Sequence, residues 1–83
     1  MITIYYFGII RETVKTETEK MAYTGPMNTD DLLEELRSRN PEWRDVLAPH
    51  KIFRLAVNHK MIFEAASLQD GDEIAILPPV TGG

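Results

Sequence analysis

The sequence predicts an α+β domain in which a mixed sheet of four to five strands wraps around one main helix, with short helical segments beside it. Two observations carry this prediction. Segments with apolar residues at every second position occur near both ends of the chain, which indicates strands with one buried face. Between them, one segment has leucines at helical spacing. A single amphipathic helix of that kind covers one face of a sheet and closes a core.

Five segments have the composition and alternation of strands. In residues 2–7, Ile2, Ile4 and Tyr6 point to one side and the residues between them point to the other. Residues 16–24 are more polar, so we expect this strand near an edge of the sheet. The other three predicted strands cover residues 52–58, 61–65 and 73–77, and a tight turn at Asn58-His59 is expected between the first two, because Asn tolerates positive φ.

The main helix is expected to begin after Asn28 or Thr29, whose side-chain oxygens cap free backbone amides, and to end at Asn40-Pro41. Its buried stripe consists of three leucines: Leu32, Leu33 and Leu36. A brief helix or turn is predicted at residues 9–15, and a second short helix at 41–48, with Asn40 as its cap and Pro41 as its first residue. The sheet and the main helix together define a core to which both ends of the chain contribute.

Composition excludes several kinds of site. The sequence has no cysteine, which rules out disulfides, thiolate metal ligands and a side-chain thiol nucleophile. Both histidines, His50 and His59, lie in predicted loops and are interpreted as solvated polar residues. We therefore expect no metal site. Ser38 and Ser67 have no neighbouring histidine in the sequence and no strained-turn motif, so neither is a candidate nucleophile.

Charge and hydropathy narrow the partners and the location. Nine basic against thirteen acidic residues give a net charge of −4, the wrong sign for a general phosphate-binding surface, so no nucleic-acid partner is expected. No stretch approaches the roughly 20 apolar residues of a membrane span. The first residues lack a basic region ahead of an apolar one. We expect neither secretion nor a membrane partner, and a cytoplasmic location.

The most informative segment is the end, Leu77-Pro78-Pro79-Val80-Thr81-Gly82-Gly83. The prolines are expected to hold the exit from the last strand extended, and six residues from Pro78 reach roughly 20 Å at ~3.3 Å per residue. The two glycines lack Cβ atoms, so the tip is thin enough for a narrow channel. Its reactive group is an α-carboxylate, which indicates that this carboxylate is itself a substrate, activated by a partner enzyme. We divide the chain into a domain (1–77) and an extended C-terminal tail (78–83).

Alternation places an apolar patch at the root of this tail. If Ile4 and Tyr6 face the core, Phe7 faces outward, and Leu77 does the same at the end of the last strand. Were the first and last strands neighbours, both would form an exposed interaction surface. The alternative is that the predicted helix at 41–48 covers them.

Four groups of residues resemble one family. They are the turn Asp70-Gly71-Asp72-Glu73-Ile74, the end Pro78-Pro79-Val80-Thr81-Gly82-Gly83, Phe7 with Arg11-Glu12, and Ala56-Val57-Asn58 before a hairpin turn. Together they resemble the small subunit of molybdopterin synthase, the MoaD family, over essentially the whole chain. The end of the chain is the most specific element of the resemblance.

The resemblance implies a β-grasp (ubiquitin-like) fold and a sulfur carrier in molybdenum cofactor biosynthesis. An adenylating enzyme of the ubiquitin-activating type would use ATP to activate the Gly83 carboxylate, and sulfur transfer would give a thiocarboxylate. The large synthase subunit, in a heterotetramer, would hold the catalytic site where sulfur passes to a pyranopterin precursor. The carrier itself would bind no cofactor.

The resemblance also assigns roles to individual residues. Gly82 and Gly83 would enter the sites of both partners, and Phe7 and Leu77 match positions that contact partners. Arg11 is a further candidate contact, although by itself it fits a solvated helix charge equally well. Insertion into the partner would involve the whole segment before Gly83: Pro78, Pro79, Val80, Thr81 and Gly82.

Three other functions remain open at this point. The chain could carry sulfur for thiamin or for tRNA thiolation, or it could be a ubiquitin-like modifier whose Gly83 is joined to lysines. The last of these is a non-reactive β-grasp adaptor, which predicts that blocking Gly83 leaves function intact.

Overall fold

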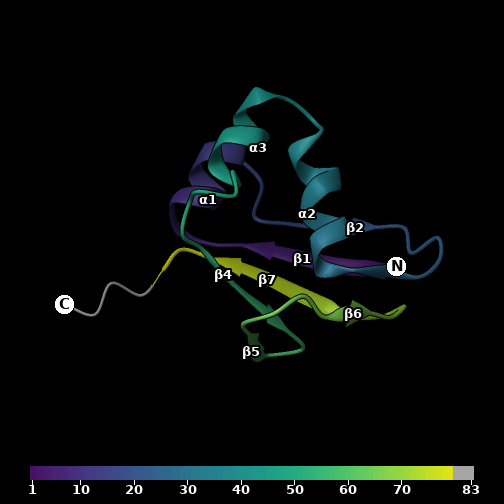
Figure 1. Cartoon of the computed structure of the whole chain (residues 1–83). Coiled ribbons are helices and arrows are strands. Elements are labelled where there is room, and N and C mark those ends of the chain that lie inside the picture. Colours follow the sequence, from purple (N-terminus) through teal and green to yellow (C-terminus); the bar gives the residue numbers. More distant parts are fainter. Residues whose placement is uncertain (80–83) are drawn as a thin grey trace.

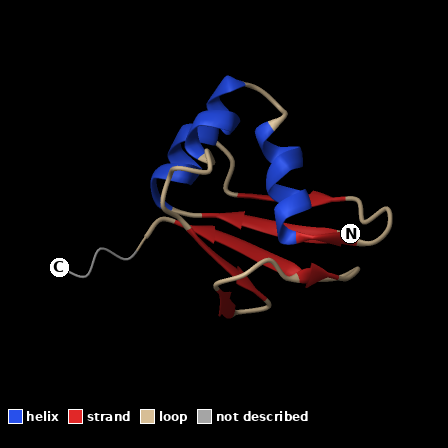
Figure 2. Cartoon of the chain, in the orientation of Figure 1, coloured by secondary structure: helices blue, strands red, loops and turns tan. Residues whose placement is uncertain are grey.

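The computed structural model describes residues 1–79. Within that part of the chain, a five-stranded sheet lies beneath a layer of helices, and all the helices cover the same face (Figures 1 and 2). The α+β, β-grasp prediction is confirmed. The helices are α1 (Gly8–Val14), α2 (Thr29–Arg37) and α3 (Pro41–Val46). The strands of the large sheet are β1 (Ile2–Tyr6), β2 (Thr18–Met21), β4 (Arg54–Val57), β5 (Lys60–Ile62) and β7 (Glu73–Leu77).

The strand order is β2-β1-β7-β4-β5, which puts the first and last strands side by side at the centre. They pair in parallel, with Ile4 opposite Ile74 and Tyr6 opposite Ile76, whereas the other pairs in this sheet are antiparallel. The sheet is therefore mixed, as predicted, and β2 lies at an edge. Because β1 and β7 run in the same direction, the exits of both strands lie at one end of the sheet.

A second, two-stranded sheet joins β3 (Met27–Asn28) to β6 (Ser67–Leu68), and the sequence did not predict it. Each strand has two residues, which is too short to show alternation. The link continues into α2, because the amide of Thr29 donates to the carbonyl of Ala66 (2.9 Å) and the amide of Ala66 donates to Thr29 Oγ1 (3.1 Å). These bonds attach the start of the main helix to the segment just before β6.

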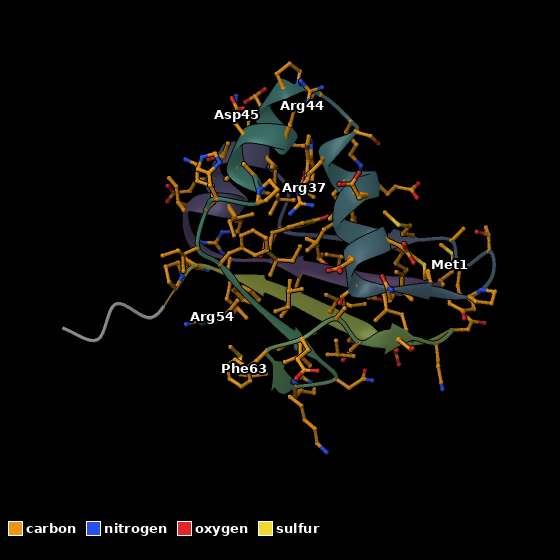
Figure 3. The ribbon with its side chains drawn as sticks, in the orientation of Figure 1. Met1, Arg37, Arg44, Asp45, Arg54 and Phe63 are labelled. Carbon is orange, nitrogen blue, oxygen red and sulfur yellow. The ribbon has the colours of Figure 1, made fainter. Side chains whose placement is uncertain are left out.

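The beginnings of α2 and α3 follow the predicted capping. Asn28 Oδ1 accepts from the amide of Asp31 (2.8 Å), and the Asp31 carboxylate accepts from the amide of Asn28 (2.9 Å), forming a capping box. Asn40 caps the amide of Trp43 (3.1 Å) ahead of Pro41. Figure 3 shows Arg37 between the two helices, where its Nε donates to the carbonyl of Leu47 (2.6 Å). That bond ties the end of α2 to the end of α3.

The core lies between the sheet and the helices. The inward residues of β1 and β7 are fully buried, and so is the leucine stripe of α2 apart from a small exposed fraction of Leu33. Tyr6 packs edge to face on Trp43 of α3, with ring centroids 5.3 Å apart at 74°. The Tyr6 hydroxyl donates to the Glu19 carboxylate, which also accepts a hydrogen bond from Arg39 Nη1 (2.8 Å). The guanidinium of Arg39 lies 4.6 Å from the centroid of the Trp43 ring. Burial and the bond to Glu19 raise the pKa of Tyr6 well above its ordinary value.

Three predicted strands are shorter than expected. The strand expected at 16–24 is limited to β2, which pairs with β1 over four positions. The strands expected at 52–58 and 61–65 are limited to β4 and β5, which pair with each other over three positions. The chain then bends away after Ile62 toward β6, which shortens the strand predicted at 61–65. No helix in residues 1–79 is long and apolar enough to cross a bilayer.

Candidate functional site

A shallow hollow lies on the sheet face opposite the helices, and we refer to it as the outer hollow. Its lining comes from alternate residues of four neighbouring strands and from the β4–β5 turn: Tyr5, Phe7, Ala56, His59, Met61, Glu73, Ala75 and Leu77. Most of these side chains are apolar. Because side chains alternate across a sheet, burial of the even-numbered residues of β1 and β7 in the core places the odd-numbered ones here.

Phe7 and Leu77, two of the three residues predicted to contact partners, both line this hollow. The amide of Phe7 donates to the carbonyl of Ile76 (3.2 Å), which holds the exit of β1 beside the exit of β7. Phe7 remains 40% exposed. The alternative that the helix at 41–48 covers this pair is wrong, because α3 packs on the other face of the sheet through the buried Trp43.

A polar cluster closes the end of the outer hollow that lies away from Phe7 and Leu77. The hydroxyl of Tyr5 donates to Glu73 Oε2 (3.1 Å), and His59 Nε2 lies 3.5 Å from Glu73 Oε1. The hydrogen bond to Glu73, with its negative charge, raises the pKa of Tyr5. His59 is held in the turn between β4 and β5, where it and Asn58 have positive φ angles of 70° and 51°. The predicted Asn-His turn is therefore present.

Sequence reasoning missed the polar cluster and most of the lining of the outer hollow. The signal was the alternation itself: once Leu55 and Val57 are assigned inward, Ala56 must face outward. The contribution of β5 depends on its pairing with β4, in which Ala56 lies opposite Met61. Glu73 was correctly placed at the start of the last strand, but it was not considered as a site residue.

The root of the predicted tail is packed against the body of the protein. Pro78 and Pro79 are half-buried. A Cβ atom at Gly8 would lie 2.7 Å from Cγ of Pro78, so the start of α1, where Gly8 has φ +60°, fits closely around the proline ring. Pro79 borders a second groove with Ile9 and Ile52. The remaining predicted tail residues lie outside the described part of the chain: Val80, Thr81, Gly82 and Gly83.

The structure does not bring Arg11 to the outer hollow. Arg11 is exposed on α1, which lies on the opposite face of the sheet from Phe7 and Leu77. His50 and His59 are both exposed. Residues 1–79 contain no group of three or more His, Cys, Asp or Glu side chains placed to hold a metal ion.

Residues 4–83 match the model of the ThiS family, which is nearly the entire sequence. The chain belongs to the ThiS family. This ThiS-family chain is 34% identical over 83 residues to the molybdopterin synthase sulfur carrier subunit of Escherichia coli, with both sequences covered completely.

Two solved structures resemble this ThiS-family chain closely. One is a chain of the complex of subunits 1 and 2 of molybdopterin-converting factor from Helicobacter pylori, with 25% identity, a TM-score of 0.69, and 99% and 97% of the two chains covered. The other is small archaeal modifier protein 1 from Methanosarcina acetivorans, with 26% identity, a TM-score of 0.73, and 99% and 95% covered. The same β-grasp fold thus occurs in proteins named for two different roles.

Proposed function

We propose that this chain is the sulfur carrier subunit of a molybdopterin synthase. The observation that carries the proposal is the complete end-to-end match to a curated subunit of that name, at 34% identity. The geometry supports it. The last strand leads from an exposed apolar hollow directly to the segment Pro78–Gly83, so one partner surface can cover the hollow and receive the end of the chain.

The chemistry takes place on the carboxylate of Gly83. A partner enzyme joins this carboxylate to AMP from ATP and releases pyrophosphate, which turns a poor acyl donor into a reactive one. Sulfide then attacks the acyl carbon and displaces AMP, which leaves a thiocarboxylate. The thiocarboxylate sulfur passes to a pyranopterin precursor in the large subunit. The carrier needs no cysteine for these steps, because the sulfur is held on the main chain.

The division of the chain follows from these roles. Residues 1–77 form the β-grasp domain that partners recognise, with Phe7 and Leu77 as contacts. Residues 78–82 form the segment that leads into the partner and places Gly83 at its active site, with Pro78 packed against Gly8 at its root. The large subunit is the partner that receives sulfur, and the complex of subunits 1 and 2 from Helicobacter pylori supports such a pairing.

The adenylating enzyme, a heterotetrameric assembly and a cytoplasmic location complete the proposal. The catalytic residues belong to the partners, and the carrier binds no cofactor of its own. Arg11 lies on the opposite face of the sheet from the outer hollow, so its proposed role is limited to a partner that also reaches α1.

A ubiquitin-like modifier is the second candidate function. The observation that favours it is the likeness to small archaeal modifier protein 1, with 26% identity over nearly the full length of both chains. In that role the activated Gly83 carbonyl is attacked by a lysine amine of a target protein. The product is an isopeptide bond instead of a thiocarboxylate.

The deciding experiment measures the intact mass of the protein by mass spectrometry after incubation with the adenylating enzyme of the same organism, ATP and sulfide. The carrier proposal expects a mass gain equal to replacement of one oxygen by sulfur. The Gly83 deletion variant should show no gain and an unchanged circular dichroism spectrum. Purified thiocarboxylate should then convert the precursor to molybdopterin when the large subunit is added. Protein conjugates through Gly83 with no thiocarboxylate would instead establish the modifier.

A further inference from the structure

The outer hollow is apolar along most of its length but ends in a carboxylate. Phe7 and Leu77 line the end nearest Pro78, and Ala75 lies midway along β7. Glu73 borders the opposite end and keeps 43% of its side chain exposed. Tyr5 donates one hydrogen bond to Glu73 Oε2 (3.1 Å). The raised pKa of Tyr5 has the Glu73 carboxylate as its cause, so the charge of Glu73 acts directly on the hollow.

The described residues leave this charge without a permanent counterion. Within residues 1–79, His59 is the only basic group within 4.0 Å of Glu73; its side chain is 89% exposed, and it is charged only when protonated. Arg54 pairs with Leu77 at the other end of β7, four positions away, which is about 13 Å along a strand. Asp72, the preceding residue, adds a second negative charge and is held by Asn58 (2.9 Å).

We propose that the protein surface that covers the outer hollow presents an arginine or lysine side chain to Glu73. This inference rests on the proposed function, because it takes the large synthase subunit as the protein that docks there. Docking removes water from every residue that lines the hollow, Glu73 included. Burying the charged carboxylate with only one neutral hydrogen-bond donor costs free energy, and a cation on the partner compensates for that cost. Partners without such a cation therefore bind more weakly.

The position of Glu73 gives this contact a second consequence. Glu73 and Leu77 are the two ends of β7, so a cation bound at Glu73 fixes how the partner lies along the strand. An apolar surface alone tolerates sliding and rotation, because the hydrophobic effect has no preferred direction. With Glu73 paired, Pro78 points to one defined place on the partner. The charged contact therefore aligns the end of the chain with the entrance that receives it.

The test measures the dissociation constant of the complex with the large subunit of the same organism by calorimetry. The variant Glu73→Gln keeps the shape of the side chain and removes its charge. The matched control Glu42→Gln removes an equal charge from α3, on the other side of the sheet. Each protein is titrated at about 50 mM and about 300 mM NaCl, between which charge attraction is progressively screened. Circular dichroism melting curves show whether each variant is folded.

The proposal expects Glu73→Gln to bind roughly tenfold more weakly or worse at low salt, and to lose most of the salt dependence of the wild type. Glu42→Gln should bind like the wild type. Equal or tighter binding by Glu73→Gln overturns the inference. So does proton uptake on binding that disappears in His59→Asn, because His59 would then supply the cation. If the wild type itself does not bind the large subunit, the proposed function fails instead.

Discussion

Phe7 and Leu77 border the same hollow although they come from opposite ends of the chain. The parallel pairing of β1 with β7 places Tyr6 opposite Ile76, and the amide of Phe7 donates to the carbonyl of Ile76. The next residue after Leu77 is Pro78, which lies against Gly8. The paired ends of β1 and β7 thus place the exposed Phe7–Leu77 surface next to Pro78, where the C-terminal segment begins.

Replacing Phe7 with aspartate is expected to weaken binding to the large subunit by at least about tenfold, because a charge then enters the centre of an apolar contact. Phe7 is 40% exposed in the free protein, so the free energy of unfolding should fall by about 1 kcal/mol or less. Calorimetric titration and urea unfolding measure the two effects separately.

Phe63→Asp is the control for this variant. Phe63 is 81% exposed, does not line the outer hollow, and lies beyond β5 on the side of the molecule away from the helices (Figure 3). Its binding should match the wild type. A large loss of stability in Phe7→Asp would show instead that Phe7 belongs to the core.

Substitution of Gly82 by valine is expected to slow sulfur transfer, because a β-branched side chain widens the segment that must pass through a narrow channel. Gly82→Ala should have an intermediate effect. Single-turnover transfer from proteins loaded to the same degree with thiocarboxylate measures this, and an unaltered binding constant would locate the defect in the last residues. Transfer rates equal to the wild type for Gly82→Val would count against insertion.

Truncation of Leu36 to alanine should lower the free energy of unfolding by about 2–5 kcal/mol, because Leu36 is fully buried between α2 and the sheet. Glu35→Ala, at the next exposed position of the same helix, controls for a change in helix propensity. Urea unfolding of both variants gives the comparison. A loss below about 1 kcal/mol for Leu36→Ala would contradict its place in the core.

Tyr6 makes stability depend on pH at the alkaline end. Burial and the bond to Glu19 raise its pKa in the folded state, whereas an unfolded tyrosine ionises near 10. Above about pH 10 the unfolded chain therefore holds fewer protons than the folded one, and the stabilisation is lost as pH rises. Below that pH it is fully present.

The variant Tyr6→Phe tests this dependence. It should be less stable than the wild type by about 1 kcal/mol at neutral pH, since the hydrogen bond to Glu19 is gone. Its stability should also fall less steeply between about pH 10 and pH 12. Equal slopes for the two proteins in urea unfolding over this range would show that Tyr6 is not the group responsible.

Local features of the sequence predicted the elements that depend on neighbouring residues. Alternation over residues 2–7 and 73–77 gave the two central strands and their buried faces. Asn28 and Asn40 marked the starts of two helices through side chains that cap nearby amides. The strands between residues 52 and 65 were found with less accurate bounds, because their ends depend on the length of the strands beside them.

The candidate site divides in the same way. The role of the end of the chain is a prediction from its prolines and glycines, whose backbone effects are defined wherever these residues occur. Glu73 was passed over because nothing near it in the sequence distinguishes it from an ordinary polar residue at the start of a strand. Its hydrogen bond from Tyr5 and its approach to His59 join three separate segments, and no local pattern contains such a combination.

The sequence by itself determined the types of the main elements and the inward and outward faces of the central strands. Those properties follow from torsional preferences and from side-chain spacing within a few residues. Only the tertiary structure decided that β1 and β7 are parallel neighbours, that α3 leaves Phe7 uncovered, and that Glu73 closes one end of the outer hollow. The reason is that strand pairing is chosen by how the entire core packs, and that choice sets which distant residues meet.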